Sequence, residues 1–109
     1  MSFNVIVTTC FKKNAKSISK RHHSLALDIE ALVISLEQNP LQGEPLGKDC
    51  YKVRMAITSK GKSGGSRIIT CVKVVDQYVY LLTIYDKSDK KNISNKELDE
   101  LLEIAGLLI

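Results

Sequence analysis

The chain has 109 residues, of which 44% are apolar and 26% are charged, a balance that excludes an intrinsically disordered protein and favours one globular domain over residues 1–109. Sixteen Lys and Arg residues outnumber twelve Asp and Glu residues, giving a formal net charge of +4. Basic residues gather between residues 48 and 73, whereas acidic residues predominate after residue 92. We therefore expect one face of the domain to suit a polyanion.

The chain ends and the cysteines indicate a soluble, cytoplasmic protein with no membrane partner. The first ten residues lack the basic lead and the long apolar run of a signal peptide, and the apolar segment 101–109 is too short to span a bilayer. Cys10, Cys50 and Cys71 are odd in number, and their spacing fits neither a zinc site nor a redox pair. We expect buried free thiols in a reducing compartment.

The first part of the chain predicts a strand and then two helices. Apolar residues alternate over residues 3–7, which predicts a short strand. Thr8 or Thr9 can cap the helix that follows. Apolar residues recur at helical spacing in two successive stripes: Phe11, Ala15 and Ile18, then Leu25, Ile29, Leu32 and Leu36. The second helix should stop at Asn39-Pro40, because Pro cannot continue it, so the two helices form a hairpin.

The second part predicts three strands and a final helix. Residues 41–49 contain two Gly and one Pro and are expected to form a loop. Residues 51–57, 67–75 and 78–85 alternate with a period of two, and their short connections predict antiparallel pairing. Ser94 and Glu97 predict a capping box. The apolar stripe that follows it consists of Leu98, Leu101, Leu102, Ala105 and Leu108. The order β-α-α-β-β-β-α predicts an α+β domain, an antiparallel sheet packed by helices.

Residues 60–67, KGKSGGSR, are the most informative segment. The triplet GKS is typical of the end of a phosphate-binding P-loop, but Ala56 replaces the required first Gly, and a strand follows where a helix is needed. These two departures argue against a P-loop. The composition also fits a flexible hairpin loop that keeps the protein soluble.

Basic residues on two neighbouring strands argue against the interpretation of this segment as a hairpin loop that only keeps the protein soluble. Lys52 and Arg54 share the polar face of one strand, and the next strand begins with Arg67. The other basic residues of the cluster are Lys60, Lys62 and Lys73. Like charges on paired strands repel each other, and a polyanionic ligand would offset that repulsion.

Several polar side chains lie outside this cluster in the sequence. The strand order should bring Tyr85 and Lys87 to the same sheet end as Arg67. His22 and His23 lie on a polar turn and are expected to be exposed. No spacing in the sequence suits a metal site, so no metal or cofactor is expected.

Four segments together resemble the RelE/ParE toxin superfamily: YKVR at 51–54, KGKSGGSRII at 60–69, YLLTIYDKS at 80–88 and NIS at 92–94. The loop is most similar to that of the HigB-type branch, and the similarity runs from about residue 50 to residue 103. The resemblance implies a RelE-like fold and a toxin of a type II toxin–antitoxin pair. Relatives of the RelE kind cleave mRNA in the ribosomal A site without a metal, using the RNA 2′-hydroxyl as nucleophile.

The resemblance assigns roles residue by residue. Arg67 would stabilise charge on the phosphate, and its side chain is expected to be exposed. The further catalytic candidates are Lys62, Tyr85 and Lys87, and the RNA-binding candidates are Lys52, Arg54, Lys60 and Lys73. Thr70 and Ile93 stand where some members carry aromatic residues, which leaves Tyr85 as the substitute.

Two other functions stay open. A ParE-like toxin would inhibit DNA gyrase without cutting RNA, and a non-enzymatic domain would only bind RNA. The convergent cations favour the nuclease, since a gyrase inhibitor has no need of them. The partners expected are mRNA, the ribosome and a cognate antitoxin of the helix-turn-helix kind. That antitoxin would cover or flank the basic face and anchor on exposed apolar residues of the helical hairpin or the last helix.

Overall fold

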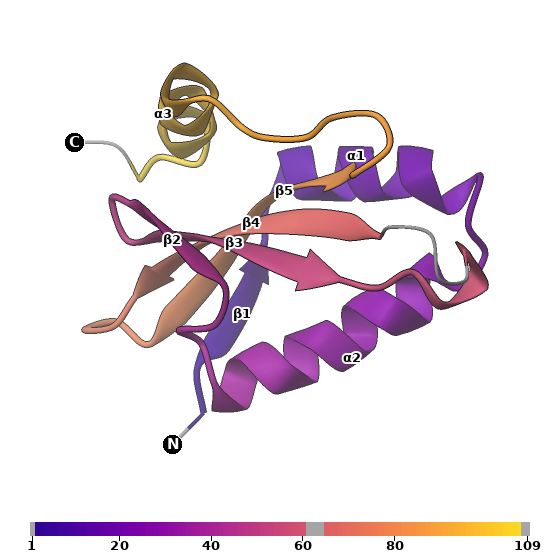
Figure 1. The fold of residues 1–109 in the computed structure, drawn as a ribbon. Helices are drawn as coiled ribbons and strands as arrows, with labels where there is room; N and C mark the ends of the chain where they lie inside the picture. Colours follow the sequence, from indigo (N-terminus) through magenta and orange to yellow (C-terminus); the bar gives the residue numbers. More distant parts are fainter. Residues whose placement is uncertain (1, 61–64, 108–109) are drawn as a thin grey trace.

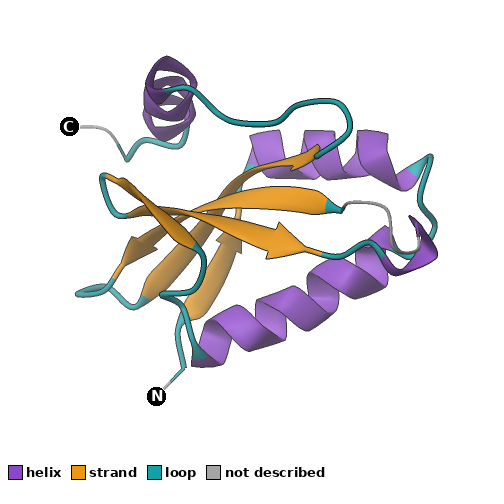
Figure 2. Cartoon of the chain, in the orientation of Figure 1, coloured by secondary structure: helices purple, strands orange, loops and turns teal. Residues whose placement is uncertain are grey.

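The computed structural model describes residues 2–60 and 65–107, which form a mixed five-stranded sheet with helices on both faces (Figures 1 and 2). The elements in chain order are β1 Asn4–Val7, α1 Thr9–Ser19, α2 Leu25–Gln38, β2 Glu44–Gly47, β3 Cys50–Met55, the 3-10 turn η1 Thr58–Lys60, β4 Ser66–Lys73, β5 Tyr78–Asp86 and α3 Asn95–Ile104. The predicted α+β class is confirmed.

The sheet has the order β1-β5-β4-β3-β2. The antiparallel pairing predicted for the three central strands is confirmed by the β3–β4 and β4–β5 ladders. The expectation of a wholly antiparallel sheet is wrong, because β1 pairs with β5 in parallel, Asn4 opposite Tyr78. Short turns dictate the direction only of strands that follow one another, and two helices separate β1 from the next strand.

The segment expected to be a loop, 41–49, contains the edge strand β2. Glu44 lies opposite Lys52, and the ladder has an irregularity between Pro45 and Gly47. An edge strand tolerates Pro, because one side of that strand donates no ladder hydrogen bonds. For this reason, the Gly and Pro content of the segment predicted a loop and did not reveal the strand.

The predicted helix ends are confirmed. The Thr8 hydroxyl accepts a hydrogen bond from the Phe11 backbone N–H at 3.3 Å and caps α1. Ser94 and Glu97 form the reciprocal capping box of α3. Such a cap satisfies backbone donors that a helix start otherwise leaves free, and it fixes where α3 begins.

Two apolar clusters hold the layers together. One face of the sheet packs against α1 and α2 through residues such as Phe11, Leu25 and Leu36. The other face packs against α3 through Leu98 and Leu102. The predicted stripes of all three helices thus face the core, while Leu108 lies outside the described residues.

The predicted strand 67–75 is too long at its end. β4 stops at Lys73, and Val74 and Val75 lie in the turn to β5 with 57% and 97% of their surfaces exposed. The apolar residues Val74 and Val75 continue the strand pattern into the turn, so the pattern did not show that the strand ends at Lys73. None of the helices in residues 2–60 and 65–107 is long and apolar enough to cross a membrane.

Candidate functional site

A basic groove opens on the α3 side of the sheet, between β2 and the segment that links β5 to α3. Its volume is about 710 Å³. The cationic side chains that line it are Lys52, Arg54, Arg67, Lys87 and Lys91. Among the described residues, Glu44 is the one carboxylate residue in this lining. A polyanion is therefore the ligand class that matches the charge of the groove.

Arg67 lines this basic groove from the middle one of three adjacent strands. It lies opposite Arg54 on β3 and opposite Tyr85 on β5, so three adjacent strands place these side chains in one row. The expectation that Arg67 is exposed is wrong: 8% of its surface is accessible. Strands on both sides and the groove walls enclose it, and its guanidinium donates to the Ser66 carbonyl at 3.1 Å.

Most cations of the groove are not neutralised by the protein itself. Among residues 2–60 and 65–107, no carboxylate forms an ion pair with Arg54, Arg67, Lys87 or Lys91. Adjacent positive charges without counterions raise the energy of the free protein, and a bound anion removes that cost.

Lys52 differs from its neighbours because the protein supplies its counterion. Its ammonium lies 2.9 Å from a Glu44 carboxylate oxygen and donates to the Asn92 side chain at 3.3 Å. The hydrogen bond and the charge of Lys52 lower the pKa of Glu44. Glu44 therefore stays ionised and competes with an incoming phosphate for Lys52.

Tyr85 contributes a buried hydroxyl beside the groove. The residue is 9% exposed, and its hydroxyl has no hydrogen-bond partner among the described residues. Burial raises the pKa of Tyr85, while the charges of Lys52 and Arg67 act in the opposite direction. The phenol is thus protonated at neutral pH and has a proton to donate to a ligand.

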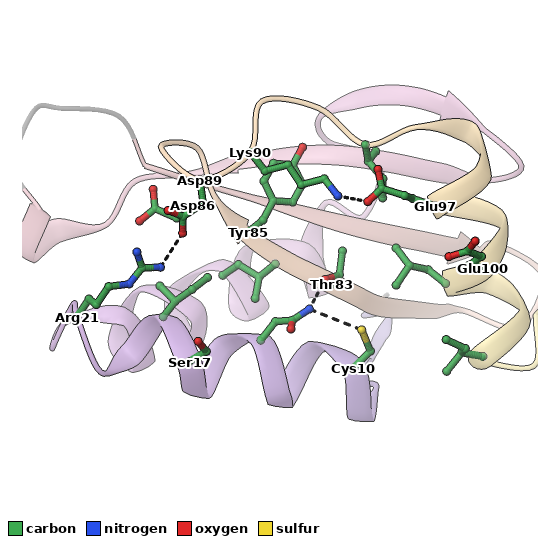
Figure 3. A pocket seen from close by; sticks show the side chains of 16 residues that line it. Cys10, Ser17, Arg21, Thr83, Tyr85, Asp86, Asp89, Lys90, Glu97 and Glu100 are labelled. Atoms are coloured by element: carbon green, nitrogen blue, oxygen red, sulfur yellow. Dashed lines mark hydrogen bonds and ion pairs between the residues drawn. The ribbon is translucent and has the colours of Figure 1, made fainter.

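A second hollow, of about 490 Å³, lies between α1 and α3 (Figure 3). The ring of Tyr85 forms part of its wall, and Lys90 lies 5.8 Å from the ring centroid while pairing with Glu97. Its carboxylate residues are Asp86, Asp89, Glu97 and Glu100, against the cations Arg21 and Lys90. This excess of acid disfavours a polyanion there, so the basic groove is the better candidate site.

The structure does not bring Lys60 into the groove. Its ammonium lies 2.7 Å from Asp86, whose side chain is 1% exposed. Although burial raises the pKa of Asp86, hydrogen bonds from Lys60, Ser88 and His22 lower it overall. His22, expected to be exposed, lies 3.2 Å from the same carboxylate with 16% of its side chain accessible. We call this set of four residues the Asp86 cluster.

Lys73 lies at the far end of β4, opposite Tyr78 and away from Arg67. Its ammonium pairs with Asp49 at 3.1 Å. Lys62 lies outside the described residues. Lys87 does line the groove, and its backbone N–H donates to the Gly65 carbonyl at 3.0 Å, which ties the start of the β5–α3 segment to the start of β4.

Three groove residues were not candidates from the sequence. Lys91 belongs to a charge run that is typical of a solvated turn, and Asn92 follows it. Glu44 lies in the segment expected to be a loop. Its placement opposite Lys52 on an edge strand is the signal that was missed. No group of three or more His, Cys, Asp or Glu residues in the described part of the chain is arranged to hold a metal ion.

Comparison with known proteins agrees with this architecture. The toxin–antitoxin complex RelBE2 from Mycobacterium tuberculosis contains a chain of similar fold, with a TM-score of 0.62 and 20% identity over 82% of this chain and 95% of that one. A double-arginine mutant of the E. coli toxin RelE in the free state has a TM-score of 0.62 and 14% identity over 94% and 97% of the two chains. The family model described as the RelE toxin of the RelE/RelB toxin–antitoxin system matches residues 4–109. The chain therefore belongs to the RelE toxin family.

Proposed function

We propose that this protein is a ribosome-dependent mRNA endoribonuclease, a toxin that a cognate antitoxin keeps inactive. The observation that carries the proposal is the facing pair Arg54 and Arg67 in a groove whose cations mostly lack protein counterions, with Tyr85 opposite Arg67 on the adjacent strand. Single-stranded RNA supplies both a polyanionic backbone and bases for an aromatic or polar side chain.

The proposed reaction needs no metal or cofactor. The RNA 2′-oxygen attacks the adjacent phosphorus, the bond to the 5′-oxygen breaks, and the proton of the 2′-hydroxyl is passed to a base as the leaving oxygen gains one. Charge builds on the phosphate oxygens, where the guanidinium of Arg67 offers paired donors that cannot deprotonate. Fixed donors of this kind lower the barrier because they are already oriented.

The other candidate residues take the supporting roles. Lys52 and Arg54 would position the RNA backbone, and Lys62 and Lys87 are the candidates for proton transfer. A lysine crowded by other cations loses its proton more easily and can act as a base. Tyr85, with its protonated and unpartnered hydroxyl, would contact a base or protonate the leaving oxygen.

A cognate antitoxin is the partner that family membership supports. The family model describes a toxin paired with RelB, and one similar structure is a toxin–antitoxin complex. We propose a cytoplasmic complex with a helix-turn-helix antitoxin, and assign the chain to the HigB-type branch on the strength of residues 60–67. Exposed apolar residues on the outer side of α2, Leu27 and Ile34, and Ile104 on α3 offer the anchor.

The decisive experiment mixes the purified chain with mRNA, with and without programmed ribosomes. We expect cleavage only when ribosomes are present, and growth arrest on expression that a co-expressed antitoxin relieves. Lys13→Ala, on the exposed side of α1, serves as the matched control and should cleave like the parent. Intact mRNA together with inhibited gyrase supercoiling would replace this proposal with a ParE-like activity.

A further inference from the structure

Two cysteines outside the groove face each other across the sheet. Cys50 on β3 lies directly opposite Cys71 on β4. The next rung is hydrogen bonded, since the Val72 N–H donates to the Asp49 carbonyl at 2.8 Å. Antiparallel rungs alternate, so the cysteines occupy a rung without mutual backbone bonds, where opposed Cα atoms are about 4.5 Å apart. That separation lies within the range of about 4.4–6.8 Å that disulfides span.

The two sulfur atoms also converge. The Cys50 sulfur lies 3.4 Å from the Lys48 carbonyl oxygen, and the Cys71 sulfur lies 3.9 Å from the same oxygen. Both residues are buried, 1% and 0% exposed, in the cluster that α3 covers. Cys10 lies on α1 in a different layer. Of the three possible pairings of the thiols, the geometry therefore favours Cys50 with Cys71.

The surroundings activate one member of the pair. A hydrogen bond with Cys50 lowers the pKa of the Cys71 thiol against the opposing effect of burial, and the nearby ammonium of Lys73 adds to the lowering. The thiolate is the nucleophile in disulfide exchange, so Cys71 is the attacking sulfur. Lys73, a candidate for RNA binding from the sequence, lies beside this thiol pair.

We propose that Cys50 and Cys71 are an oxidation site. A low-molecular-weight disulfide such as oxidised glutathione is the oxidant, and the product is a reversible cross-strand disulfide between the two cysteines. The Cys71 thiolate attacks one sulfur of the oxidant, forms a mixed disulfide and releases one glutathione thiolate. Cys50 then loses its proton and attacks the Cys71 sulfur, which releases the second glutathione. Two protein thiols are oxidised to one S–S bond, and one oxidant disulfide is reduced to two thiols.

This bond would covalently join β3 to β4, the two strands that carry Arg54 and Arg67. Because α3 covers both sulfurs, the oxidant gains access only when that helix opens. We therefore expect slow oxidation that accelerates in urea below the unfolding transition, and a higher melting temperature once the bond has formed.

The test uses the purified full chain in mixtures of reduced and oxidised glutathione, quenched with acid and then alkylated. Intact mass should show the loss of two hydrogen atoms and a single alkylatable thiol, and peptide mapping should join Cys50 to Cys71. Cys10→Ala should keep this bond, whereas Cys71→Ala should abolish it. Lys73→Gln should slow bond formation several-fold at neutral pH.

The proposal is overturned if the parent chain keeps Cys50 and Cys71 alkylatable throughout the redox series, or if its disulfide includes Cys10. This result comes from the parent protein, so it does not depend on a variant folding. No RNA or ribosome enters the assay, and its outcome is independent of the nuclease activity proposed above.

Discussion

Arg67 is the second residue of the central strand β4 and is largely buried, so its guanidinium is held in place for the proposed phosphate contact. We predict that Arg67→Ala lowers the rate of mRNA cleavage on the ribosome by about 10²–10³, the typical loss for one donor of transition-state charge. Arg67→Lys should recover only part of this rate, because an ammonium lacks the paired donors of the guanidinium.

The same variants must be checked for folding, since the side chain is buried rather than exposed. We expect Arg67→Ala to melt close to the parent, because removing it relieves repulsion from Arg54. A variant that is folded and cleaves at the parental rate would place the chemistry elsewhere in the groove.

Glu44 is the residue whose loss should strengthen binding. Its carboxylate holds the Lys52 ammonium at 2.9 Å, so Glu44→Gln frees that cation for a phosphate. We predict a few-fold tighter affinity for a short single-stranded RNA at low salt, because surface charges interact strongly there and weakly at high salt. Fluorescence anisotropy measures the change; weaker binding by this variant would show instead that Glu44 contacts the RNA.

At the scale of elements, the Asp86 cluster connects η1, the α1–α2 connection and the end of β5. Lys60, His22 and Ser88 all contact one carboxylate. We predict that Asp86→Asn lowers the free energy of unfolding by about 3 kcal/mol, because it leaves a largely buried ammonium unpaired. Asp89→Asn is the matched control: its pair with Arg21 is about half exposed, so its loss should change the free energy of unfolding far less.

The pH dependence of stability should report on the same carboxylate. The pKa of Asp86 is lowered in the folded protein, so its stabilising effect is fully present above the unfolded value of about 3.9 and is lost as the pH falls toward the folded value. Urea unfolding between pH 7 and pH 3 should show a steeper loss for the parent than for Asp86→Asn. Equal slopes would show that other groups dominate acid unfolding.

The sequence correctly predicted those features of the fold that depend on interactions between residues close together in the chain. The caps at Thr8 and Ser94 and the apolar stripes of the helices depend on residues within one or two turns. The parallel partner of β1 and the edge strand β2 depend on pairing across the fold, to which the chain nearby gives no clue. The same holds for the site. The alternation of side chains along the strands predicted that Lys52, Arg54 and Arg67 lie together. The ion pairs of Lys60 with Asp86 and of Lys73 with Asp49 depend on tertiary packing, which the sequence pattern does not show.

For the whole molecule, the uncompensated charge of the groove predicts the salt dependence of the proposed RNA binding. Arg54, Arg67, Lys87 and Lys91 have no carboxylate partner within the described ranges. Each phosphate contact with single-stranded RNA contributes about −0.7 to the slope of log affinity against log salt. If all four cations engage, the slope is about −3; a titration in NaCl that gives a slope near zero would exclude the groove as the RNA site.

The position of β5 between β1 and β4 has a consequence for biosynthesis. β1 is made first, yet its one sheet neighbour spans residues 78–86, and the groove is completed only by residues up to 92. Translation proceeds from the N-terminus, so a nascent chain can finish neither its sheet nor its groove until most of it has emerged. If the groove is the site of the proposed nuclease, the toxin can act only after most of its chain has been made, which would leave time for an antitoxin to meet each new copy.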